Sequence, residues 1–164
     1  MRRRATRGLT LLELAIVLAV LAVLSALALP NFGGRIERQR MQAAAESLAA
    51  DLTEARFEAA RRGTPLYVQS TSGSDWCWMV STLPSCPCGS AQACQLRSAG
   101  AAQHRGVELL GGLSLRLDPG GQPDAAQAVE LRTRRGERLR VELSAMGRTR
   151  ICSLTSGMGR MPAC

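Results

Sequence analysis

Arginines concentrate near the end of the chain and give the clearest chemical signal in the sequence. The 164 residues include 21 Arg and no Lys, and the formal net charge is +8. Between Leu131 and Cys164, eight arginines stand against only two acids, Glu137 and Glu142, which leaves a local charge of +6. Such an asymmetry favours an anionic partner for this part of the chain.

Two of these arginines lie in the segment Gly147-Arg148-Thr149-Arg150. On a strand, residues i and i+2 point to the same face, where two guanidinium groups can bind successive phosphates. Arg132, Arg134 and Arg138 would widen this patch. No aromatic residue follows Leu131, so binding would be electrostatic, sequence-independent and salt-sensitive. The alternative is a solvated edge strand whose arginines discourage aggregation.

Cysteines are the second group of reactive side chains. Together with an N-terminus of the exported type, six cysteines predict disulfides formed in an oxidising compartment. We expect Cys152 to pair with Cys164, and Cys77 to pair with one of the cysteines between 86 and 94; the other pairings stay open. The six are Cys77, Cys86, Cys88, Cys94, Cys152 and Cys164.

Catalytic and metal-binding patterns are poorly represented. A metal site would use three of the cysteines together with His104, but their spacing matches no common zinc pattern, and exported thiols are normally oxidised. The cysteines concerned are Cys86, Cys88 and Cys94. His104 is the only histidine, and no Ser or Cys has a recognisable base partner. We therefore expect no enzymatic activity, no metal and no cofactor.

An apolar segment, residues 9–29, follows a leader that carries four arginines. It is long enough to cross about 30 Å of hydrocarbon as a helix, with the N-terminus on the cytoplasmic side. The alternative is an ordinary secretory signal cleaved after Ala28. That alternative does not explain Glu13, whose charge is costly in lipid unless a partner neutralises it. If the chain is cut after Gly8, the new α-amino group of Leu9 on a neighbouring subunit is such a partner.

The elements that position these residues follow from periodicity. Residues 35–62 carry apolar residues at three- and four-residue spacing, which predicts an amphipathic helix, and Pro30 with Gly33-Gly34 predicts a kink or a locally melted turn before it. One long helix followed by antiparallel strands predicts an α+β fold. Short strands are expected at 66–70, 76–80, 107–110, 113–117, 128–133, 138–143 and 149–152, with residues 81–106 as a disulfide-stapled loop.

The N-terminal pattern resembles the class III signal of type IV pilins and type II secretion pseudopilins. The match consists of a basic leader, Gly8, Thr10-Leu11-Leu12, Glu13 and an apolar helix, although Leu9 stands where the family usually has Phe. The resemblance implies cleavage between Gly8 and Leu9 by a prepilin peptidase, and pairing of Glu13 with a neighbour's amine during subunit assembly; Leu9 leaves N-methylation of the new terminus open. It implies a leader at 1–8, a transmembrane and filament-core helix at 9–29, its amphipathic half at 30–63 and a β-rich head at 64–164.

The head is similar to the GspH/FimT branch of these proteins, in which the helix packs on two small antiparallel sheets. Gly147, Arg148 and Arg150 resemble the GRxR motif of FimT-like minor pilins that bind DNA during natural transformation. The resemblance implies a single-pass protein of the bacterial inner membrane with its head in the periplasm, which then enters a pilus. Its partners would be other pilins and double-stranded DNA. A GspH-like minor pseudopilin with a purely structural role in type II secretion is the alternative, and a soluble secreted disulfide protein is a third.

Overall fold

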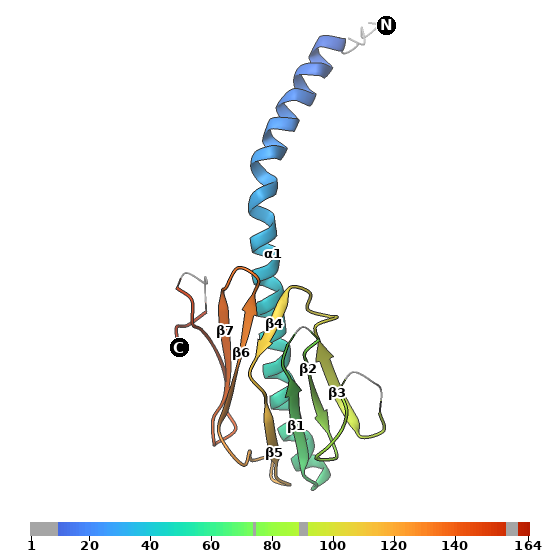
Figure 1. Cartoon of the computed structure of the whole chain (residues 1–164), viewed down its shortest axis with the longest axis vertical. Coiled ribbons are helices and arrows are strands. Elements are labelled where there is room, and N and C mark those ends of the chain that lie inside the picture. The colour runs from blue at the N-terminus through green and yellow to red at the C-terminus, as the bar shows by residue number, and fades with distance from the viewer. Residues whose placement is uncertain (1–9, 74, 89–91, 157–160) are drawn as a thin grey trace, which may run out of the picture. The chain divides into compact units, whose positions relative to one another are not determined.

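The computed structural model describes residues 10–73, 75–88, 92–156 and 161–164, with the side chains of 27–32 left aside. The chain divides into two compact units, Met1–Arg35 and Ile36–Cys164. One long helix, α1 (Leu11–Arg62), contributes to both units, and the strands of the described residues all lie in the second unit (Figure 1). The predicted α+β class is confirmed.

The first unit contains the apolar part of α1. Its large side chains between Leu11 and Leu24 are exposed. α1 is assigned as one helix through Pro30, Gly33 and Gly34, so the locally melted turn expected there is not found. Within the described residues, no helix is both long and apolar enough to cross a membrane.

The rest of α1, from Ile36 to Arg62, belongs to the second unit. Arg61 and Arg62 in its last turn complement the helix dipole, and Gly63 ends the helix with a positive φ of 63°. The amphipathic helix predicted here is confirmed, because its buried residues recur at helical spacing. They are Met41, Ala44, Ala45, Leu48, Leu52, Ala55 and Ala59.

Two four-stranded antiparallel sheets accompany this part of α1 in the second unit (Figure 1). The first has the order β3-β2-β1-β5 and the second has the order β4-β6-β7-β8, so β8 is an edge strand. The strands are β1 (Leu66–Thr71), β2 (Cys77–Ser81), β3 (Gln95–Gly100), β4 (Val107–Leu110), β5 (Ser114–Leu117), β6 (Gln127–Thr133), β7 (Arg138–Leu143) and β8 (Thr149–Ser153).

Helix and sheets share one hydrophobic core, which fixes where the polar side chains of the second sheet point. Alternate residues of β7, namely Leu139, Val141 and Leu143, are buried in that core. Because side chains alternate across a strand, the residues between them face away from the core. The outer face of the second sheet therefore carries the arginines of β6, β7 and β8.

Strand β3 corrects the sequence analysis, which treated residues 81–106 as a loop. Its sequence, QLRSAG, is polar and half-exposed, so no apolar alternation marked it as a strand. Disulfides Cys77–Cys88 and Cys86–Cys94 close the preceding turns, and β3 returns beside β2 in antiparallel register. Local pattern alone did not contain this long-range constraint.

The third disulfide joins Cys152 to Cys164, the pair that the sequence analysis favoured. It fastens the end of the chain to the free edge of β8. There the Ser153 N–H donates to the Pro162 carbonyl at 2.7 Å, and the Cys164 N–H donates to the Ser153 carbonyl at 3.1 Å. The tail therefore covers the Ser153 end of this edge.

Candidate anion-binding site

Strand β8 presents the arginines of the Gly147–Arg150 motif on an exposed edge. Arg150 pairs in register with Glu142 of β7, and both lie on the outer face of the sheet. Arg148 immediately precedes the strand, and both arginines are exposed. Among the described residues, no ion pair joins either guanidinium to a carboxylate. Arg150 donates a hydrogen bond of 3.4 Å to the Ala163 carbonyl, which carries no formal charge. Both arginines are thus free of carboxylate partners within the described residues, and two cationic groups on the same face are available to an external anion.

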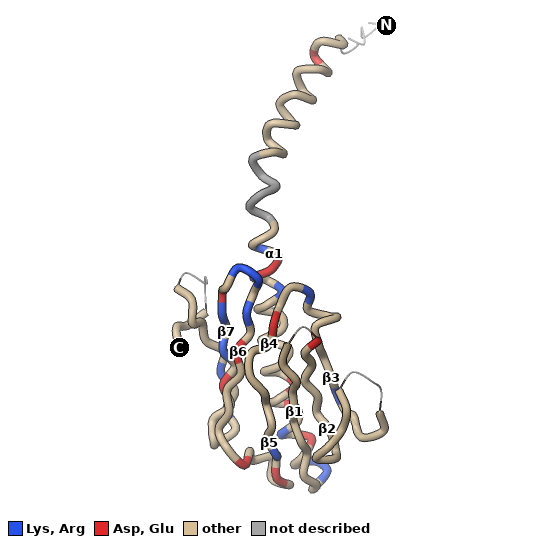
Figure 2. The backbone as a smooth tube through the Cα atoms, viewed as in Figure 1, with Lys and Arg blue, Asp and Glu red and all other residues tan. Residues whose placement is uncertain are grey.

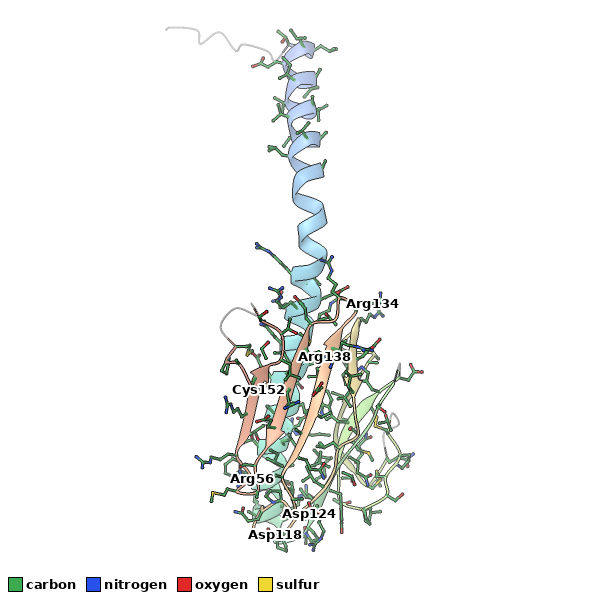
Figure 3. All side chains as sticks on the ribbon, turned by 60° about the vertical axis from the view of Figure 1, so that its left-hand side comes forward. Arg56, Asp118, Asp124, Arg134, Arg138 and Cys152 are labelled. Atoms are coloured by element: carbon green, nitrogen blue, oxygen red, sulfur yellow. A yellow bond between two sulfur atoms is a disulfide. The ribbon has the colours of Figure 1, made fainter. Side chains whose placement is uncertain are left out.

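The turn before β8 is held by Arg56 of α1, which the sequence analysis did not identify. The Arg56 side chain donates hydrogen bonds to the carbonyls of Gly121 (2.8 Å), Met146 (3.4 Å) and Gly147. Figure 3 labels Arg56 at the end of the head where this turn lies. One helix residue therefore fixes the turn from which Arg148 projects. No local sequence signal links positions 56 and 147.

Gly147 has two structural requirements that no other residue type meets easily. Its φ is +72°, in the left-handed region, and a Cβ atom there would lie 2.2 Å from the Arg56 guanidinium. The turn is closed by a hydrogen bond of 2.7 Å from the Gly147 N–H to the Ser144 carbonyl. The glycine of the motif is therefore explained by the Arg56 contact and by backbone conformation.

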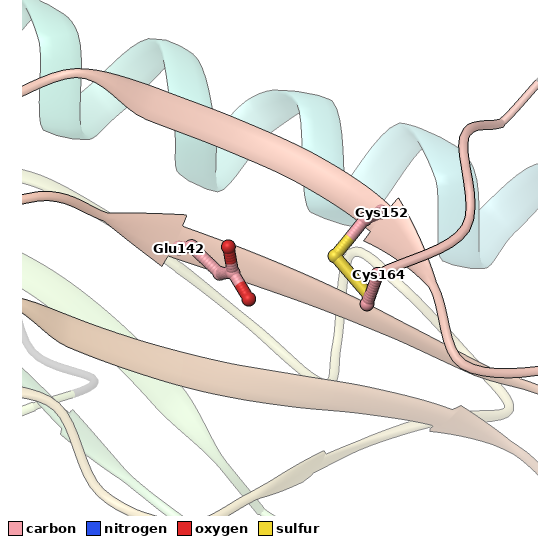
Figure 4. Close-up of side chains that lie close together, drawn as sticks. All are labelled: Glu142, Cys152 and Cys164. Atoms are coloured by element: carbon pink, nitrogen blue, oxygen red, sulfur yellow. A yellow bond between two sulfur atoms is a disulfide. The ribbon is translucent and has the colours of Figure 1, made fainter.

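A shallow hollow of about 860 Å³ lies where β7 ends and β8 begins. Arg148, Thr149 and Arg150 line one side of it, and Glu142 is the acidic residue in its wall. Glu142 also lies beside the Cys152–Cys164 disulfide (Figure 4). The Glu142 carboxylate is 3.8 Å from the Arg140 guanidinium. Arg140 therefore offsets the negative charge of Glu142 beside Arg148 and Arg150.

The other arginines of β6 and β7 are paired with glutamates. Arg132 binds Glu108 at 2.6 Å. Glu130 accepts from Arg140 at 2.8 Å and lies 3.7 Å from Arg138. The hydrogen bond from Arg140 to Glu130 raises the pKa of Arg140 further above its usual value. The basic patch predicted from composition is thus partly neutralised on this face, which Figure 2 shows as alternating charges.

The six residues predicted to bind an anion do not form one patch. Arg134 and Arg138 lie at the β6–β7 turn, and Gly147, Arg148 and Arg150 lie at the opposite end of β7. Six strand residues at about 3.3 Å each separate the two ends by roughly 20 Å. Figure 3 labels Arg134 and Arg138 toward one end and Arg56 toward the other. Arg148 and Arg150 are brought together; Arg132, Arg134 and Arg138 form a separate group.

In the first unit, Glu13 makes a local contact that the sequence analysis did not predict. The Glu13 N–H donates to Thr10 Oγ1 at 3.2 Å, which is the N-cap contact of a Thr-x-x-Glu capping box. This spacing was visible in the sequence but was not recognised. The predicted cleavage site, Gly8 and Leu9, lies outside the described residues.

His104 stacks on both tryptophans of the core. Its ring centroid lies 6.1 Å from that of Trp76 and 5.9 Å from that of Trp78. Burial lowers the pKa of His104, because the charged imidazolium loses hydration. The alternative metal set is not assembled, since Cys86 and Cys94 are joined to each other and Cys88 is joined to Cys77.

Comparison with known proteins assigns the family. The family model described as type II transport protein GspH matches residues 44–147, which is more than half of the chain. The chain belongs to the GspH family. A second model, the prokaryotic N-terminal methylation motif, matches residues 3–29. The predicted family is confirmed.

Two curated relatives fit this assignment. The chain is 45% identical over 71 residues to the pilin-like protein PilA1 of Thermus thermophilus, a match that covers 41% of this chain and 44% of the relative. It is 38% identical over 63 residues to type II secretion system protein H of Xanthomonas campestris, which covers 38% of this chain and 37% of the relative. The chain thus spans less than half the length of the curated relatives it matches.

Solved structures share the fold. The type IV minor pilin FimU of Pseudomonas aeruginosa superposes with a TM-score of 0.52 and 20% identity, covering 77% of this chain and 95% of that chain. A second crystal form of FimU gives a TM-score of 0.50 and 17% identity, covering 74% and 96%. The predicted pilin-like fold is therefore confirmed.

Proposed function

We propose that this GspH-family chain is a minor subunit of a type IV pilus whose head binds double-stranded DNA without sequence preference, for uptake in natural transformation. The observation that carries the proposal is the pair Arg148 and Arg150, exposed on an edge strand and free of carboxylate partners among the described residues. Guanidinium groups at this spacing can bind successive phosphates. The Arg56 contacts hold the turn in place before the ligand arrives, which lowers the entropic cost of binding.

The test measures binding of the full chain, in a neutral detergent, to duplex DNA at rising salt. Replacing both arginines (Arg148→Gln with Arg150→Gln) should weaken binding roughly tenfold and reduce the slope of log K against log[salt] by about 2. The matched control removes the same number of positive charges from arginines that have glutamate partners, Arg132→Gln with Arg138→Gln. This control should alter affinity by less than about twofold, because those arginines are neutralised by glutamates and lie beyond a Debye length. Equal loss in both variants would contradict a site at Arg148 and Arg150.

The same proposal assigns roles to the N-terminal segment. Residues 9–29 anchor the chain in the inner membrane, a prepilin peptidase cleaves after Gly8, and Glu13 pairs with the α-amino group of a neighbouring subunit in the filament. The match of the N-terminal methylation motif to residues 3–29 supports this assignment.

Glu13→Ala should be cleaved normally but poorly incorporated into filaments, because an unpaired amine then remains in an apolar environment. The amount of processed subunit in sheared filaments measures this. Thr10→Ala is the control: it removes the N-cap, at a cost of about 1 kcal/mol of helix stability, and keeps the carboxylate. If Thr10→Ala is incorporated into filaments as poorly as Glu13→Ala, the capping box and not the amine pairing explains Glu13.

A second candidate function, a purely structural pseudopilin of a type II secretion system, has its own support. Gly147 is explained by Arg56, and the arginines of β6 and β7 are explained by their ion pairs. If the full chain does not bind duplex DNA and restores protein secretion in a strain lacking its minor pseudopilin, this second function is the correct one.

A further inference from the structure

A groove on the inner side of β8 contains the most exposed aromatic side chain of the second unit. The groove is wide open to solvent and measures about 590 Å³. The ring of Phe57, which is 71% exposed, lies in it. The other lining residues are Ala49, Ala50, Thr53, Glu54, Thr149 and Ile151. The other α1 residues of this lining include Ala49 and Ala50, which are small, and most of the Phe57 residue is accessible to solvent.

Both walls of this groove are tied together. Thr53 Oγ1 of α1 and Thr149 Oγ1 of β8 lie 3.3 Å apart. Arg56, the neighbour of Phe57 in the chain, donates to the carbonyl of Gly147. Glu54, the acidic residue of the lining, is paired with Arg97, so its charge is offset. The groove therefore exists without a ligand and is not closed to anions by its own charge.

Strand β8 separates this groove from the two free arginines. Thr149 lines the groove and also lines the hollow that contains Arg148 and Arg150. The strand is thin, since neighbouring strands are only about 4.8 Å apart. A ligand that bends over the free edge of β8 thus meets cations on one side and an aromatic ring on the other.

The free edge of β8 also offers backbone groups. The Ser153 N–H and carbonyl point to the free edge, because they bind the C-terminal tail. Alternate residues of a strand direct their N–H and carbonyl groups to the same side. The corresponding groups of Ile151 and Thr149 therefore also point to the free edge, and within the described residues no loop or tail backbone group binds them.

We propose that this edge binds single-stranded DNA, with phosphates on Arg148 and Arg150 and one unpaired base stacked on Phe57. The proposal rests on the DNA-binding function given above and adds single strands, which use Phe57 as well as the arginines, to its substrates. A nucleotide has the required amphipathic form: a phosphate for the arginines, a base with a π-face for Phe57, and base-edge groups for the backbone of Thr149 and Ile151. A base in an intact duplex is stacked and paired and does not enter the groove, so duplex DNA uses the arginines alone.

The test compares one oligonucleotide as a single strand and as its duplex, with the full chain in neutral detergent. Phe57→Ala should weaken single-strand binding by at least about fivefold and leave duplex binding unchanged. Phe57→Tyr should retain single-strand affinity and Phe57→Leu should lose it, because stacking needs a planar ring. Leu83→Ala, at an apolar side chain that is 53% exposed and outside the groove, is the control and should change neither.

The outcomes separate this inference from the function on which it rests. If the unaltered chain binds neither form, DNA binding itself fails. If it binds both forms and Phe57→Ala changes neither affinity, the base site is wrong and the arginine site stands. If Phe57→Leu behaves like the unaltered chain, or if Phe57→Ala instead reduces incorporation into filaments without affecting DNA, the groove is a protein contact and the inference is overturned.

Discussion

Both sheets of the head are tied to α1 by a polar side chain of the helix, but the two ties differ in kind. In the first sheet, the Asp51 carboxylate accepts a hydrogen bond of 2.7 Å from the buried Trp78 Nε1. In the second sheet, Arg56 donates to backbone carbonyls of two turns, Gly121 and Met146-Gly147. The first tie depends on two side chains within the core. The second depends on the path of the backbone at the surface.

Arginines near the two ties also differ in their partners. Arg97 of the first sheet points to the helix, where it pairs with Glu54 and lies 3.6 Å from Asp51. In the second sheet the arginines of the strands face outward. Arg56 binds the turn before β8, and Arg38 of α1 binds Glu137 beside the β6–β7 turn. The charge of Arg97 thus serves packing against the helix, whereas Arg148 and Arg150 remain available.

The largest expected effect is on the backbone tie of the second sheet. Gly147→Ala should lower the free energy of unfolding by about 2–4 kcal/mol, because the left-handed backbone costs roughly 1–2 kcal/mol and the displaced Arg56 loses charged hydrogen bonds. Gly136→Ala is the matched control: its φ is +86° but no atom lies within 4 Å of its Cβ position, so only the backbone cost of about 1–2 kcal/mol applies. Urea unfolding measures both.

The Arg56→Ala background sharpens this comparison. With the guanidinium removed, Gly147→Ala should cost no more than Gly136→Ala. If the excess cost of Gly147→Ala persists in that background, the close contact with Arg56 is not its cause.

The side-chain tie of the first sheet should give the next largest effect. Asp51→Ala leaves the Trp78 N–H without its acceptor in a buried site, which should cost about 1–3 kcal/mol. The control is Glu46→Ala, an exposed position on the same helix, with an expected change within about 0.5 kcal/mol. The shift in urea midpoint at constant m-value measures the loss. In a Trp78→Phe background the cost of Asp51→Ala should fall, and an unchanged cost would show that the tie does not stabilise the sheet.

The same comparison explains which parts of the structure were predictable from the sequence. The buried stripe of α1 and strands such as β7 were predictable, because their apolar residues follow helical or alternating periods. The N-terminal motif around Glu13 indicated the family for the same reason: its signal is local. β3, Arg56 and Asp51 were not predictable, because each depends on a partner at a distant sequence position that no local pattern encodes.

The candidate site shows the same limit. Composition correctly placed the excess of arginine in the last strands. It did not reveal that Glu108 and Glu130 neutralise part of that charge, or that the helix supplies Phe57 beside Thr149. The absence of aromatic residues after Leu131 predicted a purely electrostatic surface, yet the fold brings an aromatic ring from α1 to the edge of β8.

The smallest expected effect concerns His104, whose ionisable ring stacks on Trp76 and Trp78 beside the first sheet. The chain has one histidine and two tryptophans, so the intrinsic fluorescence reports this contact directly. Burial lowers the pKa of His104 below its ordinary 6.5, which means that the unfolded chain binds this proton more readily than the folded one. The neutral imidazole therefore contributes stability that is complete above pH 6.5 and is lost as the pH falls through the folded pKa.

An imidazolium in contact with indole quenches the indole emission, so the fluorescence of the folded protein should fall with a midpoint below pH 6.5. The substitution His104→Gln should abolish this transition. A midpoint above 6.5 would mean that an acid stabilises the imidazolium and that His104 is not desolvated, which would contradict the packing of its ring against the two tryptophans beside the first sheet.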